Sequence, residues 1–211
     1  MPLRYSRLLQ SLAAALLFGS LPATVAAAVP SPPNCTVPIG LVTCPRGDVI
    51  FTVVVRDIAN LPVAGSTVEL DFGACPSFPL CDDCCDGVTL DRVNHRASMI
   101  TGANGQASFA LETGGICGGQ HVLVRADGIL LASVPEASPD QDGNLYVGTH
   151  DLDLILPKLG TQDPTADFNL DGWVTQADLD WMFPAHAGVS CNNEVVGARR
   201  SSWGALKIVY R

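Results

Sequence analysis

Short apolar segments alternate with turn-forming residues between positions 48 and 134 of the chain. The segment VIFTVVVRD (49–57) is almost continuously apolar and β-branched, which predicts a core strand. The segment STVELDF (66–72) alternates between apolar and polar residues, as a half-buried strand does. Further strands are predicted at 97–100, 107–111, 120–126 and 129–134, and turns at 60–65, 101–106 and 127–128. Short strands at this spacing predict an all-β sandwich within residues 29–137.

The segment 138–191 has a helical pattern instead, in two parts. The apolar residues that fall on one helix face are Leu152, Ile155, Leu156 and Leu159 in the first part, and Leu179, Met182 and Phe183 in the second. Each part contains a proline, Pro157 or Pro184, so we expect short or kinked helices. We expect the two apolar faces to pack against each other, and a groove for a partner is the alternative interpretation.

An internal repeat relates these two parts. When the sequence that begins at Asp140 is aligned with the sequence that begins at Asp167, the two match without a gap, so that the DLD of 151–153 meets the DLD of 178–180. Nine Asp and one Lys lie between positions 140 and 180. A solvated acidic surface has no reason to keep such a register, so the repeat indicates two copies of one functional loop.

Each repeat contains a twelve-residue loop with oxygen-bearing residues where an EF-hand loop binds Ca²⁺. In DQDGNLYVGTHD the predicted ligands are the side chains of Asp140, Asp142, Asn144 and Asp151, with the backbone carbonyl of Tyr146. In DFNLDGWVTQAD they are the side chains of Asp167, Asn169, Asp171, Thr175 and Asp178, with the carbonyl of Trp173. Mg²⁺ fits such loops less well, because it binds fewer protein oxygens and retains water.

The two loops differ at position 6, where the sharp turn of an EF-hand loop uses glycine. The second loop has Gly172 there, whereas the first has Leu145. A leucine in the left-handed conformation costs about 1–2 kcal/mol, so we expect loop one to be the weaker site. A rival register places Gly143 at position 6, but Ser138 and Thr149 then replace the two end carboxylates.

The N-terminal segment, positions 1–28, differs from the rest of the chain. Arg4 and Arg7 precede an apolar stretch at 8–18, and three alanines end at Ala28, which predicts a secretory signal peptide. A retained signal anchor is the alternative, although the stretch is shorter than the roughly 18 residues of a spanning helix. The formal net charge of −9 becomes −11 without the two arginines. This charge argues against nucleic acids and anionic membrane surfaces as partners, and we expect no membrane span after cleavage.

All eight cysteines lie beyond the predicted signal peptide, at positions 35, 44, 75, 81, 84, 85, 117 and 191. An even number in an exported chain predicts disulfides, whose pairing the sequence does not fix. We expect the cysteines from 75 to 117 to staple strand ends and a cysteine-rich insert at 75–87. Cys191 would tie the helical part back to the chain or pair elsewhere. A zinc site at Cys81 and Cys84 is less favoured, because no second pair at zinc spacing accompanies it.

Residues 48–134 resemble the group 1 bacterial immunoglobulin-like domains of the invasin and intimin type. The matching segments are VVVRDIANLPVAGSTVELDF (53–72) and TGANGQASFAL (101–111). The resemblance implies an immunoglobulin-like β-sandwich that serves as a spacer or display domain outside the cell, and it carries over no catalytic residue. The cysteine-rich insert departs from the family's pattern.

Residues 138–191 resemble type I dockerins, because no helix precedes either loop and each loop has Asp at position 12 followed by Leu. The resemblance implies a small α-helical module, folded by Ca²⁺, that docks to a cohesin on another secreted protein. In that family loop positions 10 and 11 recognise the partner, and here these residues are Thr149, His150, Gln176 and Ala177. The family's usual Ser/Thr pair is half present in loop one and absent from loop two, so calcium binding carries over better than cohesin binding.

These observations predict a mainly β, secreted or cell-surface protein with a basic C-terminal tail at 192–211, which would be a sorting tail or a terminal structural element. Its expected function is non-catalytic: a calcium-binding adhesion or assembly protein with a cohesin-like or cell-surface partner. The alternative is a small secreted carbohydrate-active hydrolase, or an accessory component of a polysaccharide-degrading assembly, with His95 or His121 as a base. No G-x-S-x-G or H-E-x-x-H motif supports the hydrolase.

Overall fold

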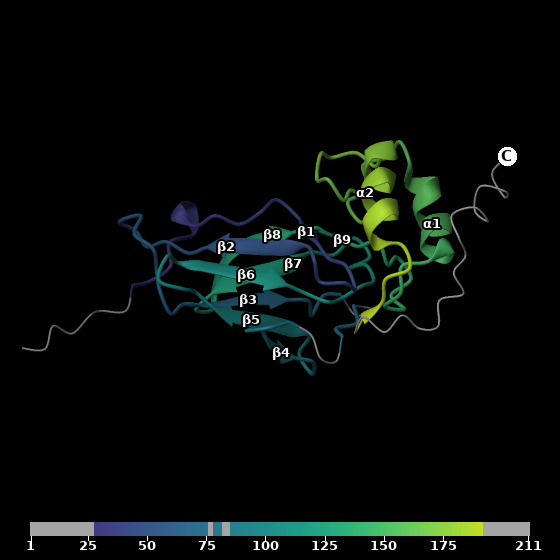
Figure 1. The fold of residues 1–211 in the computed structure, drawn as a ribbon. Helices are drawn as coiled ribbons and strands as arrows, with labels where there is room; N and C mark the ends of the chain where they lie inside the picture. The colour runs from purple at the N-terminus through teal and green to yellow at the C-terminus, as the bar shows by residue number, and fades with distance from the viewer. Residues whose placement is uncertain (1–27, 76–77, 82–84, 192–211) are drawn as a thin grey trace, which may run out of the picture.

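The structure, a computed structural model, describes residues 28–75, 78–81 and 85–191 (Figure 1). The strands are β1 Leu41–Val42, β2 Ile50–Val54, β3 Thr67–Asp71, β4 Thr89–Asp91, β5 Arg96–Ile100, β6 Gln106–Ala110, β7 Val122–Ala126, β8 Ile129–Val134 and β9 Glu136–Ala137. The α-helices are α1 Thr149–Ile155 and α2 Gln176–His186, and 3₁₀ turns lie at Pro32–Asn34 and Leu156–Lys158. The predicted signal peptide up to position 27 and the tail (192–211) lie outside the described residues.

Two antiparallel sheets form the body of the molecule. One has the strand order β4-β5-β3-β7-β8, and the other pairs β2 with β6. All six predicted strands are confirmed, with boundaries that differ by a few residues. The mainly β prediction is therefore confirmed, and the helical prediction for the following segment is confirmed as two short helices. Neither helix among the described residues is long and apolar enough to cross a membrane.

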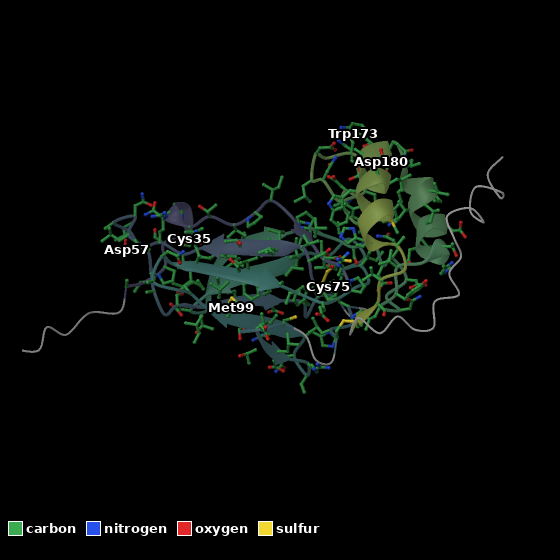
Figure 2. The ribbon with its side chains drawn as sticks, in the orientation of Figure 1. Cys35, Asp57, Cys75, Met99, Trp173 and Asp180 are labelled. Atoms are coloured by element: carbon green, nitrogen blue, oxygen red, sulfur yellow. A yellow bond between two sulfur atoms is a disulfide. The ribbon has the colours of Figure 1, made fainter. Side chains whose placement is uncertain are left out.

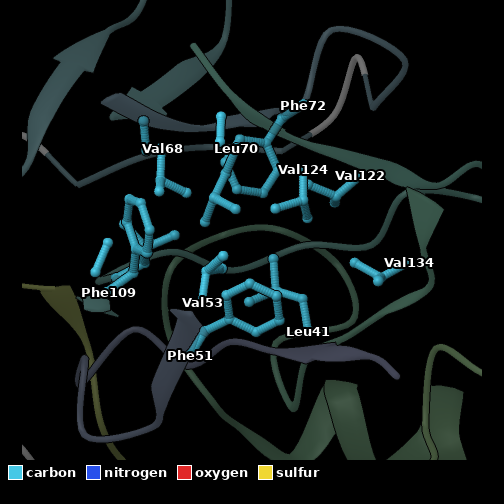
Figure 3. Close-up of a cluster of buried hydrophobic side chains, with 14 of the residues drawn as sticks. Leu41, Phe51, Val53, Val68, Leu70, Phe72, Phe109, Val122, Val124 and Val134 are labelled. Carbon is cyan, nitrogen blue, oxygen red and sulfur yellow. The ribbon is translucent and has the colours of Figure 1, made fainter. Parts of the chain in front are cut away.

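Alternating side chains fill the space between the sheets (Figure 3). Val68 and Leu70 point inward from β3 and are fully buried, while Phe51 and Val53 meet them from β2. Phe109 of β6 joins the same cluster. Each such side chain stabilises the fold by about 1.5–3 kcal/mol when it leaves water. The period of two that predicted the strands therefore decides which residues form this core.

The pairing of β1 with β9 and the edge strand β4 were not predicted. β1 and β9 have two residues each and pair in parallel, Leu41 beside Glu136 and Val42 beside Ala137. So short a strand has no detectable period and exists only because the two segments meet in the fold. β4 lies beside β5 at the sheet edge, in a segment with little apolar sequence.

The helical part is shorter than its apolar pattern predicted. α1 ends at Ile155, and the chain continues as a 3₁₀ turn that contains Pro157. Because the period of 3.6 residues ends there, Leu156 and Leu159 are exposed, which corrects their predicted place on the buried face. Leu152, Ile155, Leu179 and Met182 are buried as predicted, and the side chain of Phe183 lies outside the described part. α2 continues two residues past Pro184.

The helices pack against the end of the sandwich as well as against each other (Figure 1). Their core includes Val42, Cys44 and Ala137, which come from the sandwich side of the expected domain boundary. Lys158 fastens the connection between the two loops, since its Nζ donates to Gln141 Oε1 and to Thr165 Oγ1, both at 2.6 Å. The expectation of simple helix-to-helix packing is therefore incomplete, because the second core is shared.

Two disulfides have both partners among the described residues. Cys75 pairs with Cys117, with the Cα atoms 4.4 Å apart, and Cys81 pairs with Cys191, with the Cα atoms 5.8 Å apart. Cys85 is also disulfide-bonded. The second bridge ties the end of the helical part to the cysteine-rich insert, as expected. It also removes the zinc interpretation of Cys81, whose sulfur is engaged; Cys84 lies outside the described residues.

Cys35 and Cys44 are unpaired among the described cysteines, which corrects the prediction that all eight form disulfides. The two lie beyond opposite ends of the β2–β6 pair: Thr36 bridges to Val54, and Cys44 bridges to Glu112. A five-residue strand is about 17 Å long, whereas bonded cysteines have Cα atoms about 4.4–6.8 Å apart. Figure 2 shows Cys35 at the end of the sandwich far from the helices.

A buried carboxyl group lies at the junction of the two cores. Glu136 of β9 is 2% exposed. Its Oε1 accepts from Thr43 Oγ1 at 3.0 Å, and its Oε2 accepts from the backbone N–H of Cys117 at 3.3 Å. Burial raises the pKa of Glu136 to about 8, although both hydrogen bonds act in the opposite direction.

Glu136 therefore makes stability depend on pH. A raised folded-state pKa contributes stability that is fully present below the unfolded pKa of 4.5 and is lost as pH rises through about 8. The loss is about 1.4 kcal/mol for each pH unit within that window. We expect Glu136→Gln, whose amide can donate to the Thr43 hydroxyl, to stabilise the fold at pH 8 relative to pH 5. Urea unfolding at both pH values measures this, and an equal effect at both would contradict it.

Candidate metal centre

The two acidic loops share two hydrogen bonds at position 1. Asp140 Oδ2 accepts from the backbone N–H of Leu145, and Asp167 Oδ2 accepts from that of Gly172, both at 2.8 Å. The other oxygen of Asp140 accepts from Asn144 N at 3.2 Å, and that of Asp167 from Asp171 N at 3.1 Å. Every partner in loop two is the repeat counterpart of the partner in loop one, so the sequence register is also the structural register.

The carboxylate at position 12 closes each loop onto its beginning. Asp151 Oδ1 accepts from the N–H groups of Gln141 and Asp142, and its Oδ2 accepts from Gly148 N at 2.7 Å. In loop two, Asp178 accepts in the same way from Phe168 N, Asn169 N and Thr175 N, and also from Thr175 Oγ1 at 3.3 Å. Both carboxylates are fully buried at the start of a helix, Asp151 in α1 and Asp178 in α2.

Positions 3 and 5 stay at the surface and form short turns. Asp142 Oδ1 accepts from Asn144 N at 3.0 Å, and Asn144 Oδ1 accepts from Tyr146 N at 2.8 Å. Asn169 Oδ1 and Asp171 Oδ1 make the matching bonds in loop two, both at 2.9 Å. These turns hold exposed side-chain oxygens beside the buried carboxylates of each loop.

Two positions in each loop, 4 and 6, have a left-handed backbone. One is glycine and the other leucine, in opposite order in the two loops. At position 6, Leu145 has φ 63° and Gly172 has φ 92°. At position 4, Gly143 has φ 71° and Leu170 has φ 58°. Each loop therefore contains one leucine in the conformation that costs about 1–2 kcal/mol, which corrects the expectation that only loop one has this cost. The loops also differ at position 9, where Thr175 has a side-chain oxygen and Gly148 has none.

Three carboxylates of loop one converge. Asp140, Asp142 and Asp151 each place one oxygen within 4.8 Å of the other two. Burial raises the pKa of Asp140 to about 7, and the charges of Asp151 and Asp142 raise it as well. Burial also raises the pKa of Asp151. Like charges this close repel one another, and a divalent cation with oxygen ligands would turn that repulsion into attraction.

The predicted position-7 residues keep their side chains outside the loops. Tyr146 is 44% exposed and Trp173 is 50% exposed, so their side chains do not occupy the inside of the loops, where the backbone carbonyls are the predicted ligands. Figure 2 shows Trp173 and Asp180 at the outer end of the helical part. The four predicted partner-binding residues, Thr149, His150, Gln176 and Ala177, are all exposed in the first turns of the helices. His150 Nε2 also lies 3.9 Å from Asp142 Oδ2, so it borders loop one.

Position 8 of each loop is held by the segment that follows the opposite helix. Gly160 N, after α1, donates to the carbonyl of Val174 in loop two at 2.8 Å. Gly188 N, after α2, donates to the carbonyl of Val147 in loop one at 2.8 Å. Both valines are fully buried in the shared core. The internal repeat aligns Val147 with Val174. It did not predict that each valine would bond to the segment that follows the helix of the other repeat.

Loop one also contacts the sandwich, and the sequence did not predict this contact. Gly115 N donates to the backbone carbonyl of Asp140 at 2.7 Å. A Cβ atom at the neighbouring Gly114 would overlap the Asp140 carboxylate. The segment between β6 and β7 therefore fixes the first ligand position of loop one, and only a residue without a side chain fits there.

We predict that Gly114→Ala displaces the Asp140 carboxylate and weakens cation binding at loop one alone. Overpacking of this kind costs about 1–3 kcal/mol, which corresponds to a loss of roughly 5- to 150-fold in affinity. Calcium titration of the variant beside Gly102→Ala tests this, because a Cβ at Gly102 lies 3.3 Å from the Asn104 side chain and 3.9 Å from the Gln106 carbonyl, far from both loops. Equal losses at both loops, or no loss, would show that this contact does not position Asp140.

The two histidines considered for a hydrolase lie apart from the acidic loops. His95 lines a hollow of about 210 Å³ together with Phe78, Pro79, Leu80 and Arg92. No carboxylate is among these described lining residues. His121 is exposed, and its Nδ1 lies 3.3 Å from Ser133 Oγ. Neither arrangement assembles the pair of acidic groups that glycoside hydrolysis requires.

Comparisons with protein-family models, with curated proteins and with solved structures find no match to this chain.

Proposed function

We propose that the chain is a non-catalytic, exported adhesion or assembly protein whose helical part binds Ca²⁺ at two loops. One observation carries the proposal: the two loops repeat the same carboxylate hydrogen bonds in the register of the sequence repeat. Hydrogen bonds from backbone N–H groups orient each of these carboxylates, as they do for carboxylates that bind a metal. Repetition in two loops favours a shared ligand over a local turn preference.

Calcium suits these loops better than other cations of biology. The candidate ligands are carboxylates, an amide, a hydroxyl and backbone carbonyls, which are the oxygen donors that Ca²⁺ takes in groups of six to eight. Each loop offers both buried and exposed oxygens, and three carboxylates of loop one each place one oxygen within 4.8 Å of the other two. Mg²⁺ demands a tighter octahedron and retains several waters, so it would use fewer of these groups.

The docking part of the proposal rests on the exposed residues at the helix starts. Thr149, His150, Gln176 and Ala177 lie at positions 10 and 11 of the loops, where a dockerin-like module would meet a cohesin-like or cell-surface partner. Calcium at the loops would fix the helices that present them. The β-sandwich would then act as an immunoglobulin-like spacer that holds this module away from its attachment point.

Calorimetric titration of the full chain with Ca²⁺ tests the cation site. We expect two bound ions per chain and a much weaker response to Mg²⁺ at equal concentration, because the loops supply more oxygens than Mg²⁺ uses. Asp153→Ala is a suitable control, since Asp153 is an exposed acid of α1 outside the loop. Absence of Ca²⁺ binding would remove the proposal, and a single bound ion would restrict it to one loop.

A further inference from the structure

A second group of metal-ligating side chains lies where the sandwich meets the helices, outside the acidic loops. Cys44 and Asp48 precede β2, and His186 is the last residue of α2. One ligand atom from each, a sulfur, a carboxylate oxygen and a ring nitrogen, lies within 4.8 Å of the other two. We propose that these three residues bind Zn²⁺ and thereby clamp the end of α2 to the sandwich.

His186 is oriented as metal-binding histidines usually are. Its Nδ1 lies 3.4 Å from the backbone carbonyl of Trp181, and its ring stacks on the Trp181 ring with centroids 4.2 Å apart. A carbonyl oxygen only accepts hydrogen bonds, so this contact is a hydrogen bond when Nδ1 carries the hydrogen, and in that neutral tautomer Nε2 has the free lone pair. Metal-binding histidines are usually fixed in this way, with the other ring nitrogen donating to a backbone carbonyl.

The Nε2 atom of His186 faces a carboxylate oxygen. His186 is 5% exposed, and its Nε2 lies 3.3 Å from Asp48 Oδ1. Two lone pairs cannot face each other at that distance without a cation between them. Either a second proton on the ring or a metal ion must supply it. The Cys44 sulfur beside the same two atoms favours the metal. Sulfur is a common ligand of zinc, whereas a neutral thiol is a poor hydrogen-bond acceptor for an imidazolium ring.

The spacing suits a tetrahedral zinc centre. Bonds of about 2.0–2.3 Å at tetrahedral angles place nitrogen and oxygen ligands about 3.4 Å apart and put sulfur about 3.6 Å from each. The Nε2–Oδ1 pair already has this spacing, and the sulfur needs an inward shift of at most about 1.2 Å. Sulfur, nitrogen and one carboxylate are zinc donors, whereas Ca²⁺ takes oxygen alone. Three protein ligands leave the fourth position for water.

The surroundings of the cluster agree with this assignment. The chain turns tightly between Cys44 and Gly47, whose N–H donates to the Cys44 carbonyl at 2.9 Å, and this turn brings Asp48 beside Cys44. The Arg46 side chain holds the other Asp48 oxygen, with Nε 3.4 Å from Oδ2, so one carboxylate oxygen remains for the metal.

Other uses of this cluster fit the structure less well. A nucleophilic Cys–His–Asp arrangement needs access for substrate, but Cys44 is fully buried and His186 nearly so. A disulfide from Cys44 has no available partner among the described cysteines, because Cys35 lies at the far end of β2. A metal bound here would link two elements that are far apart in sequence, which is what a clamp between α2 and the sandwich requires.

Cobalt substitution of the full chain, kept in Ca²⁺, tests the proposal. We expect one equivalent of Co²⁺ to give the sulfur-to-cobalt charge-transfer band and the intense visible bands of tetrahedral Co²⁺, and Zn²⁺ to abolish both. Cys44→Ser should remove the charge-transfer band, whereas Cys35→Ser, at the other unpaired cysteine, should keep it. His186→Gln should weaken Zn²⁺ binding by about 100-fold or more, since even loss of an outer partner costs 10- to 100-fold.

The wild-type spectrum decides the matter even if a variant folds poorly. Absence of the charge-transfer band would show that His186 and Asp48 form a plain ion pair, with a second proton on the ring. A band that survives Cys44→Ser would place the metal at another cysteine. Both results would overturn the site. Because Co²⁺ at the acidic loops has only oxygen ligands and gives no thiolate band, the outcome is independent of calcium binding there.

Discussion

Removal of Ca²⁺ should unfold the helical part while the β-sandwich persists. Isolated helices shorter than about 12–15 residues are marginal in water, and α1 and α2 have 7 and 11 residues. Without a cation the converging carboxylates repel one another, and their burial opposes ionisation. The second core is small, and its order depends on the loops that surround it. The sandwich has its own core and two sheets, so it does not need the loops.

The tryptophans make this prediction easy to follow. All three, at positions 173, 181 and 203, come after the sandwich in sequence, so their fluorescence reports on the C-terminal part alone. Chelation with EDTA should shift this emission to the red and reduce the helical circular dichroism, and added Ca²⁺ should restore both. The β signal should remain, and the bridge from Cys81 to Cys191 should keep the unfolded part attached. Unchanged tryptophan emission and helicity in EDTA would show that the fold does not depend on a cation.

Asp178→Ala should abolish cation binding at loop two and destabilise the helical part. The carboxylate holds three backbone N–H groups and the Thr175 hydroxyl, and it is fully buried. An unsatisfied buried donor costs about 1–3 kcal/mol, so three of them predict a loss of about 3 kcal/mol or more. In Ca²⁺ the loss should be larger, because the ion stabilises only the folded loop. Urea unfolding followed by tryptophan fluorescence measures both quantities.

The repeat supplies matched controls for this variant. Asp180→Ala removes the same side chain two positions later, where it is exposed and accepts one bond from Gln176. We expect it to change stability by less than about 0.5 kcal/mol, as surface substitutions do. Asp151→Ala should weaken loop one alone and by less, because Gly148 lacks the hydroxyl that Thr175 gives to Asp178. A larger loss from Asp151→Ala would reverse the ranking of the loops.

Local patterns determined the strands, the helices and the register of the two loops. The period of two in β2 and β3 and the turns between strands are short-range properties, so the sequence shows them directly. The loop geometry also arises from contacts within one twelve-residue segment, and the matching hydrogen bonds of the two loops follow from it. The positions of the six longer strands therefore follow from the sequence alone, whereas both helices begin two residues before the loops end, earlier than the pattern predicted.

Only the tertiary structure decided which distant segments meet. β1 and β9 are too short to have a period, and they exist because Leu41 lies beside Glu136. The pairing of Cys81 with Cys191, the close approach of Gly114 to Asp140 and the meeting of Cys44 with His186 each join residues far apart in sequence. Local sequence does not encode such contacts, because they depend on how the whole chain packs. For the same reason the second core draws Val42 and Ala137 across the expected domain boundary.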